Sequence, residues 1–377
     1  MGAHTGVPLQ EMARTVKHFS LHRIAGDRPE LGEGIELRVI SDVETGVLPV
    51  IQVEEAVIRG YVRAAGLETC PAWPHRWVTL FIMHDLQPLV RQLRRVDYPV
   101  GRASVPPGGA AALDHRPVVN VYDLADPDAC QVFVNQQAMV REGYWDDPLA
   151  IRGLLAHEHA HPLAENGTTQ ASRQLRLDLE VDSGQDLFQD QDRKSKITSL
   201  LALLADELSL NAPREIFANE LTIRGGFGEA LLHLDRRNVA TAGRSVAGRE
   251  DLVQQLQQQV AHGTLTPAAA DLLLLVGDLR STLNLVLEVA PFYRTGRESD
   301  ARELETVLET AVFPHLEPQV ARAYVALRQE TIALCADLSL PGFVAWSEGV
   351  LRILAEALAE KGLLLETHLR RTDQGTA

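Results

Sequence analysis

The spacing of apolar residues changes along the chain, from short alternating stretches in the first part to helical periods in the second. Residues 35–40 (IELRVI) alternate and are rich in β-branched side chains, which predicts a short strand. Two further β-rich stretches, 117–124 and 130–137, are separated by the turn-like sequence ADPDA. Residues 50–66 instead carry apolar residues at helical spacing and end in glycine, which predicts a helix and its C-terminus.

From about residue 196 onward, apolar residues recur with the period of an α-helix almost without interruption. Pro213 is predicted to break the first part of this region, because proline has no backbone N–H to donate. Residues 236–250 are small and polar and provide the best candidate for a domain boundary. The predicted helices cover residues 197–210, 214–223, 251–261, 268–290, 301–313, 319–338 and 349–360.

These elements predict an α+β protein. Residues 1–34 are polar, contain several glycines and prolines, and are expected to be a loosely ordered leader. Residues 35–235 are predicted to form an α+β domain with a short sheet, and residues 250–377 an α-helical C-terminal domain. The C-terminal helices could be a lid, a docking module or a dimerisation element, so this region could bind a partner or a second copy of the chain.

Charge and composition narrow the classes of function. The chain has 36 basic and 51 acidic residues, a formal net charge of −15, and so acidic a surface repels nucleic-acid phosphates. The most apolar stretch, 268–290, contains Asp271, Asp278 and Arg280, which predicts a core helix and not a membrane span. The three cysteines are far apart, and the N-terminal segment has no apolar core typical of a signal peptide. We therefore expect a cytoplasmic protein with neither nucleic acid nor a membrane as partner.

The sequence His-Glu-His-Ala-His at residues 157–161 contains the motif H-E-x-x-H. His157 and His161 are four residues apart, so on a helix both imidazoles lie on one face and can bind one metal ion. Glu158 is next to the first histidine, where its carboxylate can take a proton from a metal-bound water. Residues 146–161 begin with two aspartates and a proline, which is typical of a helix N-terminus.

The motif is specific for a chain of this composition. With 13 histidines in 377 residues, roughly 0.03 such motifs are expected by chance. An apolar stripe precedes the motif and predicts that its helix is anchored in a core; it consists of Leu149, Ile151, Leu154 and Leu155. The alternative is a buried helix whose histidines are only hydrogen-bonded, a false positive that any short motif allows.

This motif, preceded by a β-rich stretch and a helix with an acidic start, resembles the zincin superfamily of metallopeptidases. In zincins the strand before this helix pairs with an extended substrate. The sequence after His161, PLAENGTTQ, contains no third histidine, so the motif is similar to that of the gluzincin branch and not to that of the metzincins. The resemblance covers about residues 117–225. It implies a zinc ion and a glutamate on a later helix as third ligand, commonly with an Asp or Asn four residues further on.

The sequence LADELSLN (204–211) fits the third-ligand pattern best, with Glu207 followed one turn later by Asn211. Glu220, in ANELTI, resembles the Asn-Glu of thermolysin-like enzymes, but Arg224 stands in the place of the supporting acid. Three further acids are alternatives: Glu215, Asp206 and, close to the motif, Glu165. Each of these acids could instead be solvated on a helix face, as most acidic residues are.

Several other polar residues near the motif could take part in the site. His159 lies between the two histidine ligands but on another face of the helix, so a surface or supporting role is expected. Tyr144, Arg224 and His233 are candidates for a donor to the transition state, although single polar residues of this kind are more often structural.

The leading hypothesis is a zinc-dependent metallopeptidase that hydrolyses a peptide or protein substrate. His157, His161 and Glu207 are the expected zinc ligands, and Glu158 is the expected general base. A zinc-stabilised scaffold or interaction protein is the first alternative, but a structural zinc site needs no adjacent base. A zinc hydrolase that acts on a non-peptide amide is the second alternative.

Overall fold

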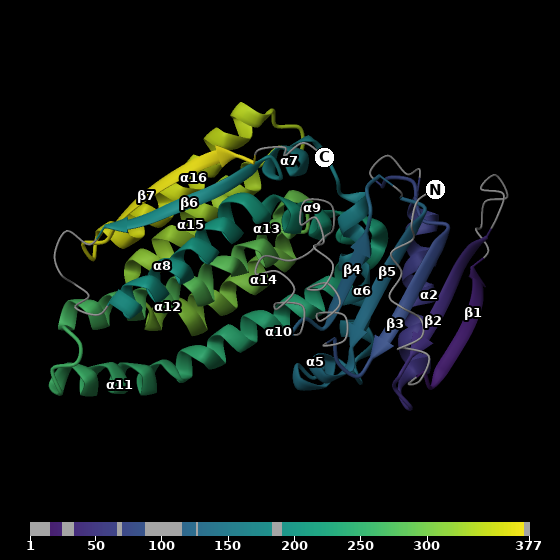
Figure 1. The fold of residues 1–377 in the computed structure, drawn as a ribbon, viewed down its shortest axis with the longest axis horizontal. Helices are drawn as coiled ribbons and strands as arrows, with labels where there is room; N and C mark the ends of the chain where they lie inside the picture. Colours follow the sequence, from purple (N-terminus) through teal and green to yellow (C-terminus); the bar gives the residue numbers. More distant parts are fainter. Residues whose placement is uncertain are drawn as a thin grey trace. The chain divides into compact units, whose positions relative to one another are not determined.

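The computed structural model describes residues 16–24, 34–65, 70–86, 115–125, 127–182 and 191–372 (Figure 1). These residues form a mixed five-stranded sheet, a second sheet of two strands and many helices, so the predicted α+β class is confirmed. Contacts between residues divide the chain into two units. Unit 1 comprises Met1–Ala164 and Leu221–Leu234, and unit 2 comprises Glu165–Glu220 and Asp235–Ala377.

The large sheet of unit 1 has the strand order β1-β2-β3-β5-β4. Strands β2, β3 and β5 run parallel to one another, and the outer strands β1 and β4 are antiparallel to their neighbours. Helix α2 (Val47–Ala64) is the crossover that the parallel pair β2 and β3 requires. The strands are β1 (His18–Ile24), β2 (Ile35–Ser41), β3 (Trp77–Met83), β4 (Val118–Tyr122) and β5 (Ala129–Asn135).

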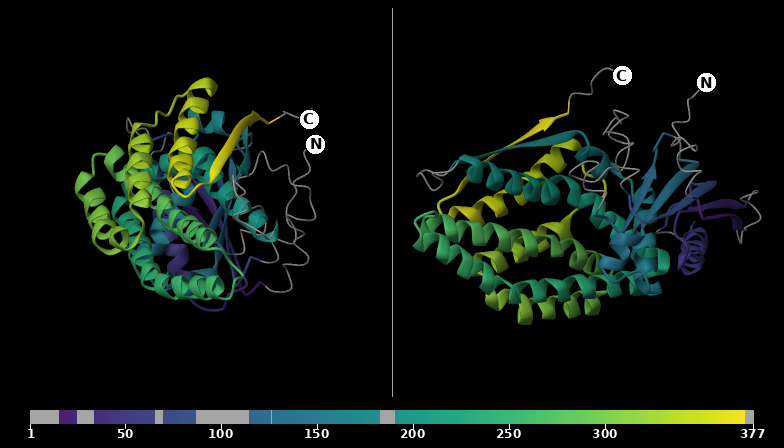
Figure 2. Two further views of the ribbon diagram at one scale, coloured as in Figure 1. Left: turned by 90° about the vertical axis from the view of Figure 1, so that its left-hand side faces the viewer. Right: turned by 60° about the horizontal axis from the view of Figure 1, so that its bottom comes forward.

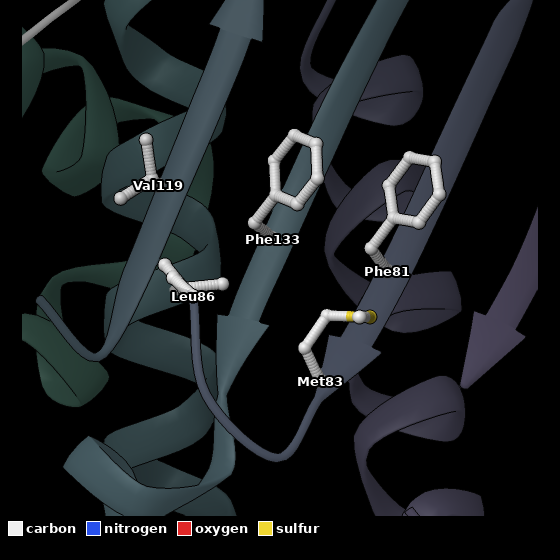
Figure 3. Packing of buried hydrophobic residues seen from close by; sticks show 5 residues of the cluster. All are labelled: Phe81, Met83, Leu86, Val119 and Phe133. Carbon is white, nitrogen blue, oxygen red and sulfur yellow. The ribbon is translucent and has the colours of Figure 1, made fainter. Parts of the chain in front are cut away.

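Helices cover one face of this sheet. Helix α2 packs against β1 and β2, helix α6 (Pro148–Leu163) packs against β4, and the two helices contact each other. Successive residues of a strand point to opposite faces, so Leu80 and Ile82 of β3 face the helices while Phe81 faces away. On that other face Phe81 and Phe133 stack with their ring centroids 4.7 Å apart (Figure 3).

Two shorter helical segments complete the described part of unit 1. Helix α5 (Gln136–Arg141) follows β5 directly and is capped by the side chain of Asn135. The π-helix η3 (Ile223–Phe227) contains Gly226, whose φ of 90° kinks the chain before helix α10 (Gly228–Ala247) begins. Only glycine adopts such a φ without steric cost, so this kink depends on Gly226.

Unit 2 is predominantly helical, and its helices bury apolar stripes against one another. Helix α13 contacts both α14 and α15, and α15 contacts α16. Among the described residues, no helix combines the length and the apolar character needed to cross a membrane. The elements are α7 (Gly167–Ser172), α8 (Gln191–Asp206), η2 (Glu207–Asn211), α9 (Ala212–Thr222), α11 (Arg249–Ala261), α12 (Pro267–Thr282), η4 (Leu283–Leu285), α13 (Val286–Arg294), α14 (Glu298–Val307), η5 (Leu308–Val312), η6 (Phe313–His315), α15 (Pro318–Ala333) and α16 (Leu340–Ala359).

A two-stranded antiparallel sheet joins the beginning of unit 2 to its end. Strands β6 (Leu175–Asp182) and β7 (Leu364–Arg371) pair along their whole length and lie side by side in both views of Figure 2. Helix α8 packs against β6 and helix α16 against β7. An isolated pair of strands is only marginally stable in water, so these helices stabilise the pair by covering it.

The predicted leader contains a strand. Residues 18–24 form the outer strand β1, which pairs with β2. Exposure alternates along this strand: Phe19, Leu21 and Arg23 are exposed, while Ile24 is buried. The other parts of that predicted leader, residues 1–15 and 25–33, lie outside the described residues.

Pro213 does not break the helical region as predicted. Helices α8, η2 and α9 follow one another without interruption, and the wider π-helical turn of η2 lies just before Pro213. Proline cannot donate to the carbonyl four residues earlier, which is that of Ser209. The hydroxyl of Ser347 donates to this carbonyl instead, at 2.9 Å. The helix therefore continues because a side chain from α16 replaces the missing donor.

One division between the two units, between Leu234 and Asp235, lies at the end of the predicted domain 35–235. The stretch 236–250, however, is not the linker that its small polar residues predicted. Most of this stretch continues helix α10, which ends at Ala247, and its alanines favour a helix. The two units divide the chain differently from the predicted domains 35–235 and 250–377, since residues 165–220 pack with the C-terminal helices.

Candidate metal centre

Helix α6, which carries the H-E-x-x-H motif, begins at a strong N-terminal cap. Asp147 Oδ1 accepts hydrogen bonds from the backbone N–H groups of Leu149 and Ala150, both at 3.1 Å, and Pro148 occupies the first turn. The other carboxylate oxygen, Oδ2, accepts from His233 Nε2 at 2.7 Å. His233, one of the candidate transition-state donors, is therefore bound at the start of α6 in this structure.

His157 and His161 lie one turn apart on α6, as the motif predicts. Their ring centroids are 4.6 Å apart and the ring planes are nearly perpendicular, at 81°. His161 is buried, with 2% of its surface exposed, and His157 is half-buried. The two imidazoles are therefore close enough to share one metal ion at a site that is largely shielded from water.

Glu158 connects α6 to the outer strand β4. Its Oε2 accepts a hydrogen bond from the backbone N–H of Asn120 at 3.1 Å, and its backbone carbonyl accepts from Asn120 Nδ2 at 3.1 Å. Only 8% of Glu158 is exposed. The proposed general base is thus held at the edge of the sheet by both the backbone and the side chain of one strand residue.

His159 is completely buried on the opposite face of α6, where it is bonded to Glu54 of α2. The distance from His159 Nε2 to Glu54 Oε1 is 2.8 Å, and both side chains are 0% exposed. Of the two roles predicted for His159, the surface position is therefore wrong. This pair restrains the rotation of α6 about its axis, and so supports His157 and His161 from behind.

A layer of aromatic and polar side chains continues behind that pair. The Trp73 ring lies 5.2 Å from the His159 ring and 5.1 Å from the His75 ring. His75 donates from Nδ1 to the Pro127 carbonyl at 2.6 Å, and burial lowers the pKa of His75 to about 4. His75 is therefore neutral at neutral pH and acts as a buried hydrogen-bond donor.

Tyr61 provides a second connection between α2 and α6. Its hydroxyl donates to the backbone carbonyl of Ala156 at 2.7 Å, just before the motif. Burial raises the pKa of Tyr61 well above its usual value, so the phenol stays protonated and remains a donor. The backbone of the motif is thus held on one side by Tyr61 and on another by Asn120.

A third group that could bind a metal is Glu215 of α9 (Ala212–Thr222). One ligand atom each of His157, His161 and Glu215 lies within 4.8 Å of the other two. Glu215 is half-buried. The carboxylate that joins the two histidines is therefore that of Glu215, an alternative from the sequence, and Glu207 is not part of this group.

Other predicted acids are engaged elsewhere. Glu220 is 6% exposed, and its carboxylate forms an ion pair with Arg294. Glu165 binds Arg173 through both carboxylate oxygens. Asp206 accepts a hydrogen bond from Asn211 Nδ2 at 2.7 Å, and burial raises the pKa of Asp206. The amide of Asn211, expected to support a histidine ligand, therefore donates to Asp206.

Two imidazoles and one carboxylate form a donor set that suits zinc. Catalytic zinc sites use three protein ligands of these types and keep a fourth position for water or substrate. The chemistry of the donors and the burial of His161 therefore fit a catalytic zinc ion better than a calcium or magnesium ion, which prefer oxygen ligands alone.

Sequence reasoning missed the residues that support the motif from α2 and β4. Glu54 gave a weak signal, because it is an acid within the apolar stripe of the predicted helix at residues 50–66. Tyr61 and Asn120 gave none, since their partners on α6 are distant in sequence. Comparison with protein-family models, with curated proteins and with solved structures finds no match to this chain. The function is therefore argued from the site alone.

Proposed function

We propose that this chain is a zinc-dependent metallopeptidase in which His157, His161 and Glu215 bind the metal and Glu158 is the general base. The observation that carries the proposal is the grouping of these three ligands beside an acid that the motif places next to the first histidine. The proposal moves the third-ligand assignment from Glu207 to Glu215. The free thiols of Cys70, Cys130 and Cys335 agree with a cytoplasmic enzyme.

A zinc ion held by His157, His161 and Glu215 would supply a Lewis acid and would lower the pKa of a nearby water towards about 7. Glu158 would take a proton from the attacking water as the water oxygen bonds to the carbonyl carbon. Glu158 then gives the proton to the amide nitrogen as the C–N bond breaks. Asn120 keeps one carboxylate oxygen in a fixed position through its backbone N–H, which orients the base.

The outer strand β4 supports a peptide as substrate. Strand β4 pairs with β5 on one side, and Glu158 lies against the backbone N–H of Asn120. An extended peptide can add to the exposed edge of a sheet through main-chain hydrogen bonds. A peptide bound along β4 would then pass beside Glu158, which favours a peptide bond over other amides as the group that is cleaved.

A non-catalytic zinc protein is the alternative, and one observation favours it. Glu158 is buried and bonded to Asn120, so this residue has a structural role that does not depend on catalysis. A zinc-stabilised scaffold would keep the same three ligands. Metal content alone therefore cannot separate the two functions, and a variant that changes only the base is needed.

The substitution Glu158→Gln tests the proposal, because the amide oxygen of glutamine can still accept from Asn120 while the side chain can no longer take a proton. We expect this variant to keep zinc near one ion per chain and to lose peptide hydrolysis by about 10²–10⁴-fold, as the loss of a general base does. Glu142→Gln, at an exposed acid after α5, is the control and should hydrolyse normally. Normal hydrolysis in Glu158→Gln would contradict the mechanism, and loss of zinc would make Glu158 a ligand.

A further inference from the structure

A row of three polar side chains lies on β1, the outermost strand of the large sheet (Figure 1). Successive residues of a strand point to opposite faces, so His18, Ser20 and His22 share one face. All three are half-buried, whereas the residues between them are exposed. A strand face that packs against a helix is usually apolar, so packing alone does not explain this row.

The hydroxyl of Ser20 lies between the two imidazoles. Its Oγ is 2.7 Å from Nε2 of His22 and 3.1 Å from Nε2 of His18. A serine hydroxyl has a single proton, so it donates to one of the two rings and accepts from the N–H of the other. The tautomer of each ring decides which one receives the proton.

Glu55 of α2 determines the tautomer of His22. Its Oε1 lies 2.8 Å from Nδ1 of His22, and Nη2 of Arg59 lies 3.8 Å from its other oxygen, Oε2. A carboxylate beside Nδ1 favours the tautomer that carries its proton there, so Nε2 of neutral His22 has a lone pair. Ser20 therefore donates its proton to His22 and accepts from His18.

These side chains have the arrangement of a nucleophile, a base and an acid that orients the base. A nucleophilic hydroxyl needs a base within hydrogen-bond reach, about 2.6–3.2 Å, and the base needs a third group at its other nitrogen. The distances from His22 to Ser20 and to Glu55, 2.7 and 2.8 Å, meet both conditions. Such a constellation is recognised by its geometry and not by the fold that carries it.

We propose that Ser20 and His22, oriented by Glu55, form a second hydrolytic site in unit 1, which cleaves carboxylic esters through an acyl-serine. Ser20 Oγ bonds to the ester carbonyl carbon as its proton passes to His22 Nε2; the carbon–oxygen bond to the alcohol then breaks, and the alcohol takes that proton. A water molecule next bonds to the same carbon and gives a proton to His22. Ser20 Oγ then leaves with that proton, which releases the carboxylic acid. Glu55 is a positioning residue, because it acts on Ser20 only through His22.

A carboxylic ester is the substrate class that this site fits. His22 and Glu55 are 30% and 26% exposed, so water reaches the site, and water weakens the electrostatic stabilisation on which the harder cleavage of an amide depends. Alternate residues of an outer strand direct their N–H groups away from the sheet, so either Ser20 or Leu21 has its N–H at the outer edge. Such an N–H can donate to the carbonyl oxygen of the ester as this oxygen becomes negative.

Covalent labelling of the full chain with a fluorophosphonate tests this site, since an activated serine displaces fluoride from this reagent. We expect peptide mass spectrometry to find the phosphonyl adduct at Ser20. Ser199 is the internal control, because it is an exposed serine whose hydroxyl donates to the backbone carbonyl of Ser195, and it should stay unlabelled. The proposed metallopeptidase uses water as nucleophile and forms no covalent intermediate, so the adduct is independent of that proposal. The absence of an adduct at Ser20 would overturn the site.

Hydrolysis of 4-nitrophenyl butyrate tests the turnover of an ester. We expect Ser20→Ala to lower kcat at least tenfold, and labelling of the wild type to lower it equally. Any hydrolysis at the metal centre persists in Ser20→Ala, so it is measured separately. An unchanged kcat in Ser20→Ala would overturn the proposed ester cleavage.

Two further variants test the roles of the base and of the positioning acid. His22→Gln should slow labelling of Ser20 by about 10²–10⁴-fold, because glutamine can hold the hydroxyl but cannot take its proton. Glu55→Gln should slow labelling at least tenfold, because the amide can donate to Nδ1 and so favour the wrong tautomer. Glu44→Gln is the matched control: Glu44 is an exposed acid that pairs with Lys17, and its variant should be labelled at the wild-type rate. Circular dichroism checks that each variant is folded, and wild-type labelling rates in folded His22→Gln or Glu55→Gln would contradict the proposal.

Discussion

At the scale of single residues, the buried pair of Glu54 and His159 should have the largest effect on stability. Glu54→Ala leaves the His159 ring in the interior without its hydrogen-bond partner. Leaving a buried hydrogen-bonding group without its partner typically costs about 1–3 kcal/mol. We expect a decrease of that size in the free energy of unfolding, measured by urea denaturation monitored with circular dichroism.

Glu55→Ala is the matched control for this prediction, because Glu55 is the next residue on α2. Its carboxylate lies 2.8 Å from His22 Nδ1, in a pair whose side chains are 26% and 30% exposed. Ion pairs that water reaches contribute up to about 1 kcal/mol, so the expected decrease is small. Equal decreases for Glu54→Ala and Glu55→Ala would contradict the structural role of the buried pair.

Single substitutions also test which residue is the third zinc ligand. Removal of a ligand should weaken zinc binding by more than the 10–100-fold typical of supporting residues, so Glu215→Ala should lose zinc to a competing chelator. Glu207→Ala should keep zinc, since Glu207 is outside the ligand group. Asn211→Ala should have little effect on zinc, because its amide donates to Asp206. The reverse result, with zinc lost from Glu207→Ala alone, would restore the assignment made from the sequence.

At the scale of elements, α6 could be predicted closely because its signals are local. The aspartates, Pro148 and the spacing of His157 and His161 all act within one helix, and the structure begins α6 at Pro148. The path of the chain through Pro213 could not be predicted, since the missing backbone donor is replaced by Ser347 of α16. The same reason explains Glu220, whose partner Arg294 lies on α13. Long-range partners decide which acids are available to a metal.

The close packing of α6 against α10 leads to a prediction at this scale. A Cβ on Gly153 would lie 2.7 Å from the carbonyl oxygen of Ala230 and 2.5 Å from Leu234 Cδ1. Backbone cannot move as easily as a flexible side chain, so Gly153→Ala should displace α6. We expect the free energy of unfolding to fall by about 1–3 kcal/mol, the usual cost of overpacking, and zinc affinity to fall with it.

Gly277→Ala in α12 is the control for Gly153→Ala. Gly277 is exposed within a helix, and nothing lies within 4 Å of its added Cβ. Alanine favours a helix over glycine by about 0.8–1.0 kcal/mol, so this variant should be more stable than the wild type. Opposite signs for the two substitutions support the close approach of α6 and α10. If neither variant is less stable than the wild type, α6 and α10 are further apart than in the structure.

At the scale of the whole molecule, buried acids in unit 2 should make stability depend on pH. Asp235 is 3% exposed, and its Oδ2 accepts no hydrogen bond from the residues that the structure describes. Glu288 accepts from Asn238 at 3.0 Å through Oε1, while its Oε2 is buried and likewise without a donor in the described part of the chain. Burial raises the pKa of Glu288 to about 8, and burial together with Glu288 raises the pKa of Asp235 well above its usual value.

The folded chain therefore holds a proton on Glu288 that the unfolded chain releases near its ordinary pKa of 4.5. Because the folded state binds more protons, the stabilisation is fully present below about pH 4.5 and is lost as pH rises towards about 8. Glu288→Gln mimics the protonated acid and still accepts from Asn238, so the decrease in the free energy of unfolding over this range should become shallower in zinc-free protein. Glu303→Gln is the control, because Arg236 lowers the pKa of Glu303 and leaves it ionised over the same range. Urea denaturation at several pH values decides the matter: parallel pH profiles for wild type and Glu288→Gln would mean that Glu288 titrates normally and that its carboxylate reaches water.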